Sequence, residues 1–167
     1  MNWSKFLTYG DSQQNAFETL CNQLFERYLK RIYNTGLIKF RVINGAGGDG
    51  GIEAYGQLNS GDIIAIQSKW FQQSIDDSEI KQIKNSILTA KTIRTQIKEY
   101  IICIPHNVSS LKIGRGKKPT SNHEENKINA LNDEIYSIYP DLKLIWWFDN
   151  EILSELQQDN NEGVHKY

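Results

Sequence analysis

The sequence predicts one α/β domain in which a mixed β-sheet carries helices on both faces. Its 167 residues have room for one compact core and little more. Apolar residues recur at helical spacing in some segments and at strand spacing in others. The order of these segments, helix, three strands, helix, strand, helix, strand, helix, is typical of a sheet covered on both sides.

The first helix is predicted from Asp11 and Ser12 onward, where apolar side chains recur at the spacing of one helix face. These side chains are Phe17, Leu20, Cys21, Leu24, Phe25, Tyr28, Leu29 and Ile32. Asp11 or Ser12 can accept hydrogen bonds from the free amides of the first turn. The sequence Asn34-Thr35-Gly36 provides the stop.

Three strands are expected next, interrupted by a glycine-rich segment. Residues 37–43 alternate well enough for a strand and lead into residues 45–51, of which five are glycine, so no helix can persist there. Residues 51–58 and 62–71 indicate two strands joined by a glycine-containing turn at 59–61. The second of these strands starts as an unbroken apolar run, as in a central strand buried on both faces.

The second half of the chain alternates helices and strands. Its spacing predicts a helix at 78–98, a strand at 99–104, a helix at 124–139, a strand at 142–148 and a helix at 150–157. Asp149 or Asn150 is expected to cap the last helix, and the polar segment 106–123 is expected to be a surface loop. Residues 1–157 therefore form the predicted domain, and residues 158–167 a polar tail or linker.

The charge balance excludes a polycationic nucleic-acid binder. Lys and Arg number 19 against 20 Asp and Glu, for a formal charge of −1, so attraction to nucleic acid must come from local patches. The sequence shows neither a targeting signal nor the run of about 18 apolar residues that a bilayer span needs. A cytoplasmic protein without membrane contact is expected. Cys21 and Cys103 lie in apolar stretches and are expected to be buried thiols.

The context of the glycine loop disfavours dinucleotide binding. Residues 45–50 match G-x-G-x-x-G and follow a predicted strand. The loop leads into a hairpin, however, and not into a helix whose amino end holds a pyrophosphate. A nucleotide-binding signalling domain remains a distant alternative, and phosphates bound at residues 45–50 would be its sign.

Polar side chains converge where the central strand ends. Gln67 and Lys69 are two residues apart, so they are expected on one face of the strand, with Ser68 turned away. Glu53 and Gln67 are centred on position 60 inside the turn, so they are expected to be cross-strand neighbours. Burying these groups is costly unless they bind one another or something else. Together with Asp49, they predict a binding or catalytic centre.

Oxygen ligands beside an ammonium group fit metal-dependent hydrolysis of phosphodiesters. Glu53, Asp49 and the side-chain carbonyl of Gln67 are the candidate ligands for Mg²⁺, which prefers hard oxygen donors and keeps several waters. Lys69 is expected to orient or help deprotonate such a water and to offset charge growing on the phosphate oxygens. Glu18 borders the apolar stripe of the first helix and either faces the same site or is solvated.

Several motifs of the chain together resemble a known nuclease family. Residues 47–53 (Gly-Gly-Asp-Gly-Gly-Ile-Glu), followed by Gln67-Ser68-Lys69, resemble the Mrr-like branch of the PD-(D/E)xK superfamily. More narrowly, a set of four motifs resembles the amino-terminal nuclease domain of bacterial Avs (AVAST) antiphage proteins, which are STAND NTPases. These motifs are Ala16 to Cys21, Gly45 to Ala54, Gln67 to Phe71 and Cys103 to Pro105. The resemblance covers about residues 1–156.

The resemblance implies a restriction-endonuclease-like fold and Mg²⁺-dependent cleavage of double-stranded DNA, with Mn²⁺ as a substitute metal. It also implies ATPase and sensor regions in a longer parent protein, which bring nuclease domains together when a phage protein is recognised. Glu53 takes the place of the usual Asp, Gln67 and Lys69 match the Q-x-K pair, and Glu18 matches the helical acid. Glu at position 53 has a longer side chain than Asp, so whether Glu53 or Asp49 is the principal ligand stays open. Gln67 in place of an acid removes a negative charge, and modest metal affinity is expected.

Two clusters of basic residues are candidates for contacts with DNA phosphates. One falls within an arc of roughly 80° on the second helix and consists of Lys81, Lys84 and Lys91. The other, on the polar loop, consists of Lys112, Arg115, Lys117 and Lys118. An ordinary solvated face is the alternative for both, and neither indicates base-specific reading. The aromatic clusters 70–71 and 146–148 are expected to pack in the core.

The expected function is that of a sequence-non-specific DNA endonuclease domain, an effector in antiphage defence that hydrolyses phosphodiester bonds with a metal-activated water. The alternative is a catalytically silent module of the same fold that binds DNA or mediates assembly. Plasmid cleavage that requires both Mg²⁺ and Lys69 would separate the two.

Overall fold

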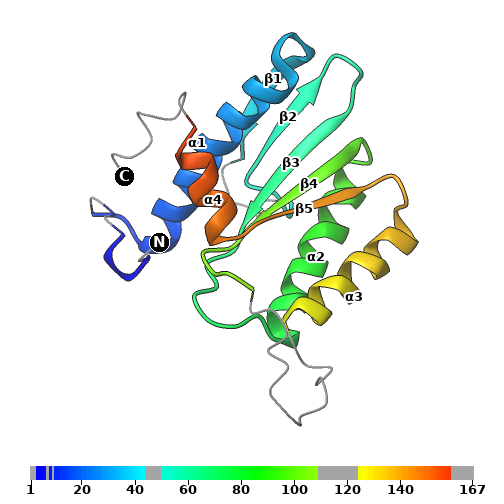
Figure 1. Cartoon of the computed structure of the whole chain (residues 1–167). Helices are drawn as coiled ribbons and strands as arrows, with labels where there is room; N and C mark the ends of the chain where they lie inside the picture. The colour runs from blue at the N-terminus through cyan, green and yellow to red at the C-terminus, as the bar shows by residue number, and fades with distance from the viewer. Residues whose placement is uncertain (1–2, 7, 9, 44–49, 109–123, 159–167) are drawn as a thin grey trace.

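The computed structural model describes residues 3–6, 8, 10–43, 50–108 and 124–158 (Figure 1). These parts of the chain form four α-helices and one five-stranded sheet. In chain order the elements are α1 (Gln13–Tyr33), β1 (Leu37–Val42), β2 (Ala54–Leu58), β3 (Ile63–Ser68), α2 (Asp77–Ile93), β4 (Ile97–Cys103), α3 (Glu124–Ile138), β5 (Lys143–Trp147) and α4 (Asp149–Leu156), with 3₁₀ turns at Trp3–Lys5 and Asn34–Gly36. None of these helices has the length and apolar character needed to cross a membrane.

The sheet is mixed, as predicted, and its strands lie in the order β1-β2-β3-β4-β5. β2 pairs antiparallel with both β1 and β3, whereas β4 pairs parallel with both β3 and β5. α2 and α3 form the crossovers that parallel pairing requires. Both pack on one face of the sheet, and α1 and α4 pack on the other (Figure 1). The predicted α/β class with helices on both faces is therefore confirmed.

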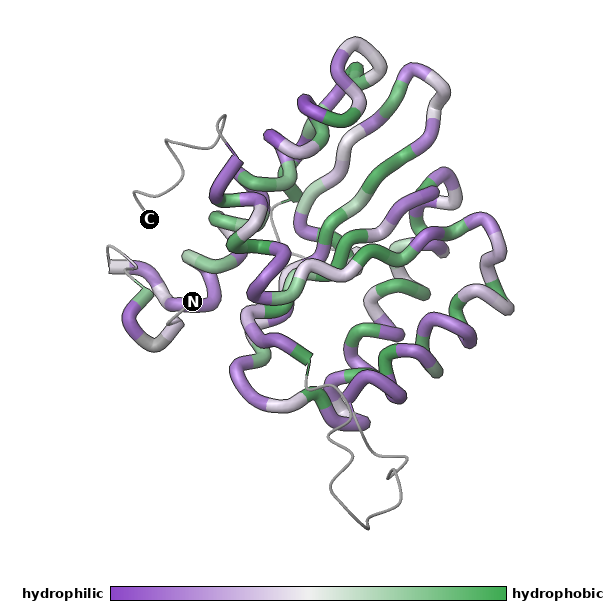
Figure 2. Tube along the Cα trace, in the orientation of Figure 1, coloured by the Kyte–Doolittle hydropathy of each residue, from purple (hydrophilic) through white to green (hydrophobic). Residues whose placement is uncertain are grey.

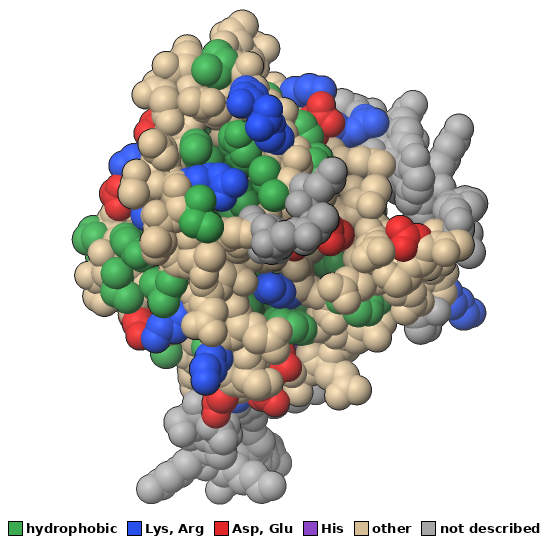
Figure 3. All heavy atoms as spheres, turned by 180° about the vertical axis from the view of Figure 1, so that it is seen from behind, with side chains coloured by type: hydrophobic (Ala, Val, Ile, Leu, Met, Phe, Trp, Pro, Cys, Tyr) green, Lys and Arg blue, Asp and Glu red, His purple; other side chains and the backbone are tan. Residues whose placement is uncertain are grey.

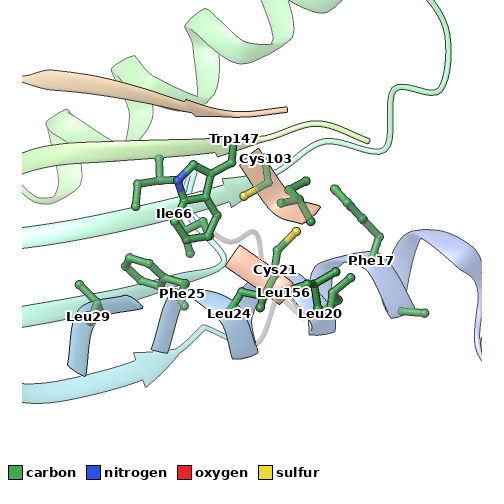
Figure 4. Close-up of a cluster of buried hydrophobic side chains, with 14 of the residues drawn as sticks. Phe17, Leu20, Cys21, Leu24, Phe25, Leu29, Ile66, Cys103, Trp147 and Leu156 are labelled. Atoms are coloured by element: carbon green, nitrogen blue, oxygen red, sulfur yellow. The ribbon is translucent and has the colours of Figure 1, made fainter. Parts of the chain in front are cut away.

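Two apolar cores hold these layers together, one on each face of the sheet. Figure 4 shows the core under α1 and α4, where Phe25 of α1 lies near Ile66 of β3 and Phe17 lies at the other end of the cluster. Cys21 and Cys103 are buried in this core, as predicted. The second core lies under α2 and α3 and is built mainly of isoleucine. β3 contributes to both cores because its successive side chains point to opposite faces, and Figure 2 shows apolar residues concentrated in the central strands.

The ends of α1 confirm the predicted stop and one of the two candidate caps. Ser12 Oγ accepts a hydrogen bond from the Asn15 N–H at 3.1 Å, which satisfies a free amide of the first turn. The helix ends at Tyr33, and Asn34 follows with a φ of 41°. A positive φ is incompatible with continuing the helix, and Asn adopts it more readily than most residues.

α2 ends earlier than predicted. Its last residue is Ile93 and β4 already begins at Ile97, so the prediction of a helix to residue 98 was wrong. Lys91 is buried, and its Nζ donates to the carbonyl oxygens of Thr95 and Ile97 at 3.0 Å each. The side chain predicted to face DNA therefore holds the turn between α2 and β4, a pairing that helical spacing alone does not reveal.

α4 begins one residue earlier than predicted, and neither expected cap acts as one. Asp149 is the first helical residue, and its carboxylate accepts a hydrogen bond from Trp3 Nε1 at 2.7 Å. At the helix start the Phe148 N–H donates to the Glu151 carboxylate at 3.0 Å. Asp149, which was expected to cap the helix, thus instead accepts a hydrogen bond from the N-terminal segment, which is far away in sequence.

β2 starts later than predicted because the chain turns at two glycines. Gly50 and Gly51 have φ angles of +61° and +79°, which side chains other than glycine rarely adopt. A Cβ atom on Gly51 would lie 2.1 Å from the backbone oxygen of Ser86 in α2. The turn therefore packs closely against α2. Glu53 follows it directly before β2 begins.

Replacing Gly51 by alanine is expected to lower the free energy of unfolding by about 3 kcal/mol, since it adds backbone strain and displaces α2. Gly61→Ala is the matched control, because Gly61 also has a positive φ of 89° but has open space around it. Its expected loss is about 1 to 2 kcal/mol. Urea unfolding of both variants measures the difference, and equal losses would contradict the contact with α2 as the reason for glycine.

Candidate active site

The pairing of β2 with β3 brings Glu53 and Gln67 together. Ala54 pairs with Ile66, and the pairing continues one residue further, where the Glu53 N–H donates to the Ile66 carbonyl at 2.8 Å. Gln67 Nε2 then donates to Glu53 Oε1 at 2.6 Å. Both residues are buried, with exposed fractions of 7% and 2%. The predicted cross-strand contact is confirmed.

A cleft of about 700 Å³ opens beside this pair, between α1, α2 and the end of β3. Four of the five predicted catalytic residues line it, namely Glu18, Glu53, Gln67 and Lys69. Asp49, the fifth, lies outside the residues that the structure describes. Further lining residues are Gln14, Asn15, Thr19, Ser68, Trp70, Phe71 and Gln82. Ser68 also lines the cleft, although the alternation of side chains along the strand had predicted that it points away from the site.

Backbone pairing and aromatic packing position Lys69 at this cleft. Lys69 follows the last residue of β3, and its N–H donates to the carbonyl of Cys103 at 2.9 Å, so that the pairing with β4 continues through it. Trp70 comes next and packs against Phe17 of α1, with 5.2 Å between the ring centroids. Glu18 follows Phe17 on α1. The packing of Trp70, which was predicted, therefore brings the lysine and the helical acid to one cleft.

Tyr100 is a member of the site that the sequence did not single out. It lies on β4 beside Ala65 of β3 and is fully buried. Its hydroxyl group donates to the carbonyl of Gly51 and lies 3.2 Å from Gln67 Oε1. A tyrosine at the start of the apolar run of β4 was the available signal, since a buried hydroxyl needs a polar partner.

The amide group of Gln67 is turned so that its nitrogen faces Glu53 and its oxygen faces Tyr100. The prediction made the amide oxygen a metal ligand beside Glu53. In the observed arrangement that oxygen points the other way, and it reaches a cation beside Glu53 only if the amide group turns over. After such a turn the amide nitrogen can donate to the Tyr100 hydroxyl oxygen, which in turn can keep donating to Gly51.

The Cys103 thiol lies in an apolar core close enough to Glu53 to be affected by its charge. Burial raises the pKa of the Cys103 thiol well above its usual value, and the neighbouring Cys21 and the charge of Glu53 raise it further. The thiol therefore stays protonated at neutral pH and is no candidate nucleophile. A carboxylate against such an apolar wall attracts a cation more strongly than it would in water.

The oxygen donors at the cleft suit Mg²⁺ better than a softer metal. Within the described residues no group of three or more His, Cys, Asp and Glu side chains gathers around one point. Glu53 is the buried carboxylate, and Glu18 lines the cleft as a half-buried acid. Mg²⁺ commonly binds through one or two carboxylates and keeps several waters, so this donor set is compatible with it.

The lysines predicted to contact DNA on α2 do not form one exposed face. Lys84 forms an ion pair with Glu134 of α3 at 2.5 Å, and Lys91 is buried. Lys81 is exposed. The loop cluster, with Lys112, Arg115, Lys117 and Lys118, lies outside the described residues. Of the α2 cluster, only Lys81 is therefore placed as a surface contact would require.

Sequence comparison assigns no family to the chain. Its comparison with models of known protein families and with curated proteins found no match. The geometry of the cleft and the chemistry of its side chains therefore carry the functional argument.

Tyr100→Phe is expected to lower the free energy of unfolding by about 1 to 3 kcal/mol, because the carbonyl of Gly51 loses a buried hydrogen-bond donor. Tyr136→Phe, at an exposed position, is the matched control and is expected to change it by less than about 0.5 kcal/mol. Urea unfolding measures both values. Wild-type stability of Tyr100→Phe would show that the hydroxyl does not hold the glycine turn.

Proposed function

We propose that the domain is a metal-dependent DNA endonuclease of the restriction-endonuclease-like class, without sequence specificity. The observation that carries the proposal is the meeting of Glu18, Glu53, Gln67 and Lys69 at one cleft, from segments up to 51 positions apart in the sequence. A buried acid, an amide and an ammonium group have no common packing role. The mixed sheet with helices on both faces agrees with the architecture that the sequence resemblance implies.

Each side chain has a distinct role in this proposal. Glu53 binds Mg²⁺, or Mn²⁺ in its place, together with the Gln67 carbonyl and with Asp49. Such a metal ion supplies Lewis-acid chemistry, since it polarises a phosphate oxygen and lowers the pKa of a bound water. Lys69 orients the attacking water and offsets charge that develops on the phosphate oxygens. Glu18 acts from α1 as an outer acid that orients waters in the cleft.

The sequence resemblance extends the proposal to a biological role. The domain is the effector of an antiphage protein, and it cleaves double-stranded DNA when several copies are brought together. The ATPase and sensor regions that would assemble these copies belong to a longer parent protein. The near-zero net charge supports this arrangement, because weak binding of single domains to DNA would keep them inactive before assembly.

A catalytically silent module of the same fold is the second candidate, and the state of Gln67 favours it. This residue stands where related sites carry an acid, and its amide N–H is bonded to the Glu53 carboxylate at 2.6 Å. A site that fills its ligand position with its own amide group can be held together without any cation. Such a module would bind DNA or mediate assembly but would not cleave.

Cleavage of supercoiled plasmid in the presence of Mg²⁺ tests the two candidates. The wild-type protein is expected to nick and linearise the plasmid, and Lys69→Ala and Glu53→Gln are each expected to reduce the rate by at least about 100-fold. Lys98→Ala is the matched control, because Lys98 is a lysine paired with Asp141 on the surface and away from the cleft. A chelator is expected to abolish cleavage.

The same assay on a protein fused to a dimerising coiled coil covers the case in which cleavage needs two copies. Equal rates of the wild-type, Lys69→Ala and Glu53→Gln fusions would contradict the endonuclease. Absence of Mg²⁺-dependent cleavage by the wild-type fusion would favour the silent module.

A further inference from the structure

β1 and β2 carry basic side chains on the side of the sheet that faces α2. Arg41 pairs with Tyr55, and Tyr55 pairs with Ala65 of β3, which belongs to the core under α2. Residues that pair directly across neighbouring strands point to the same face. Arg41 and Lys39, two residues apart, therefore both point to the α2 side, and both are exposed. Glu53 borders this side too, because it bonds Gln67, which is two residues from Ala65 on β3.

Arg94 adds a third positive charge above the same strands. It directly follows α2, and its guanidinium carbon lies 5.6 Å from the centre of the Tyr55 ring. Its Nη1 atom is buried and has no hydrogen-bond partner in the part of the chain that the structure describes. A Cβ atom on Gly50 would lie 3.3 Å from that nitrogen. Arg94 thus borders the turn that leads to Glu53.

These three cations form no ion pair with an acid of the described residues. Neither β1 nor β2 contains an Asp or Glu. No ion pair of Lys39, Arg41 or Arg94 occurs among the described residues, whereas Lys84 and Lys98 are each paired with a carboxylate. Figure 3, the view from behind, shows Lys and Arg side chains lying among apolar ones. In a chain with a charge of −1, this makes a local positive patch.

The patch leads from the site to the edge of the sheet. Residues two apart on a strand are separated by about 6.6 to 7 Å, and residues paired across strands by about 5 Å. Tyr55 is one such strand step from Glu53, and Arg41 is one cross-strand step from Tyr55. Lys39 lies a further strand step away on β1, which is the edge strand. A polyanion bound along β1 would therefore lie about one strand step and one cross-strand step from Glu53.

We propose that Lys39, Arg41 and Arg94 hold the phosphate backbone of duplex DNA beside the cleft at Glu53. The inference rests on the proposed function, for which it supplies the path of the substrate. Contacts of this kind reach phosphates and not base edges, so they give sequence-independent affinity that falls steeply with salt. An alternative role of charged residues on an exposed edge strand is to prevent its pairing with strands of other chains. If that were their only role, replacing them would not change the affinity for DNA.

Fluorescence anisotropy with a labelled 30-base-pair duplex, in a chelator so that no cleavage occurs, tests the surface. The triple variant Lys39→Ala, Arg41→Ala, Arg94→Ala is expected to bind at least tenfold more weakly than the wild-type protein at low salt. The slope of log affinity against log salt is expected to become shallower by about 2.7, from about 0.9 per lost phosphate contact.

The matched control is the triple variant Lys30→Ala, Lys98→Ala, Lys143→Ala, which loses the same charge from lysines that are already paired with acids. Its affinity is expected to stay within about twofold of the wild-type value, because surface ion pairs contribute little. Circular dichroism of both variants confirms that they fold. A loss of affinity in the first variant alone supports the proposal.

Two results would contradict the proposed DNA-binding role of these three residues. One is equal affinity of the two triple variants, or no binding by the wild-type protein at low salt. The other is tighter binding of duplex RNA or of single strands than of duplex DNA. The plasmid assay with Glu53→Gln tests the nuclease activity separately. If cleavage does not depend on Glu53 but the first triple variant still loses affinity, the protein is a DNA-binding module that does not cleave.

Discussion

The pairing register of β2 with β3 is the constraint on which both the core and the site depend. Side chains alternate along a strand, so a shift of β2 by one residue would separate Glu53 from Gln67 and exchange the side chains that β2 presents to the two faces of the sheet. β3 is buried on both faces, so its apolar run alone does not fix the register. The short turn after β2 and the contact of Gly51 with α2 set the point at which β2 begins. Folding the core therefore assembles the site.

Burial of the Glu53 carboxylate next to an apolar wall is the feature that most needs a functional explanation. Taking a carboxylate out of water is strongly unfavourable unless hydrogen bonds or a cation compensate it. The amide of Gln67 supplies one bond, and the Tyr100 hydroxyl contacts the oxygen end of that amide. An amide group can turn either its nitrogen or its oxygen toward Glu53. The nitrogen can donate to the carboxylate when no cation is bound, and the oxygen can bind a cation when one is present.

Much of the fold could be predicted because helical and strand spacing report which faces are buried, and turn length reports which residues pair. The contact of Glu53 with Gln67 followed from the turn between them. Spacing could not show which neighbour covers a helix face, and so Lys91, buried at the end of α2, was placed among the DNA contacts. Tyr100 was missed because a tyrosine next to an apolar run in a strand is usually a packing residue. The orientation of the Gln67 amide depends on that tyrosine and was equally hidden.

The position of a bound cation tests the account most directly. In crystals of the protein soaked with Mn²⁺, anomalous diffraction is expected to show a peak about 2.0 to 2.2 Å from a carboxylate oxygen of Glu53, with the Gln67 amide oxygen turned toward the ion. A protein that takes up Mn²⁺ elsewhere, or takes up none at saturating concentration while Glu53 and Gln67 stay hydrogen-bonded, would contradict a metal-dependent site.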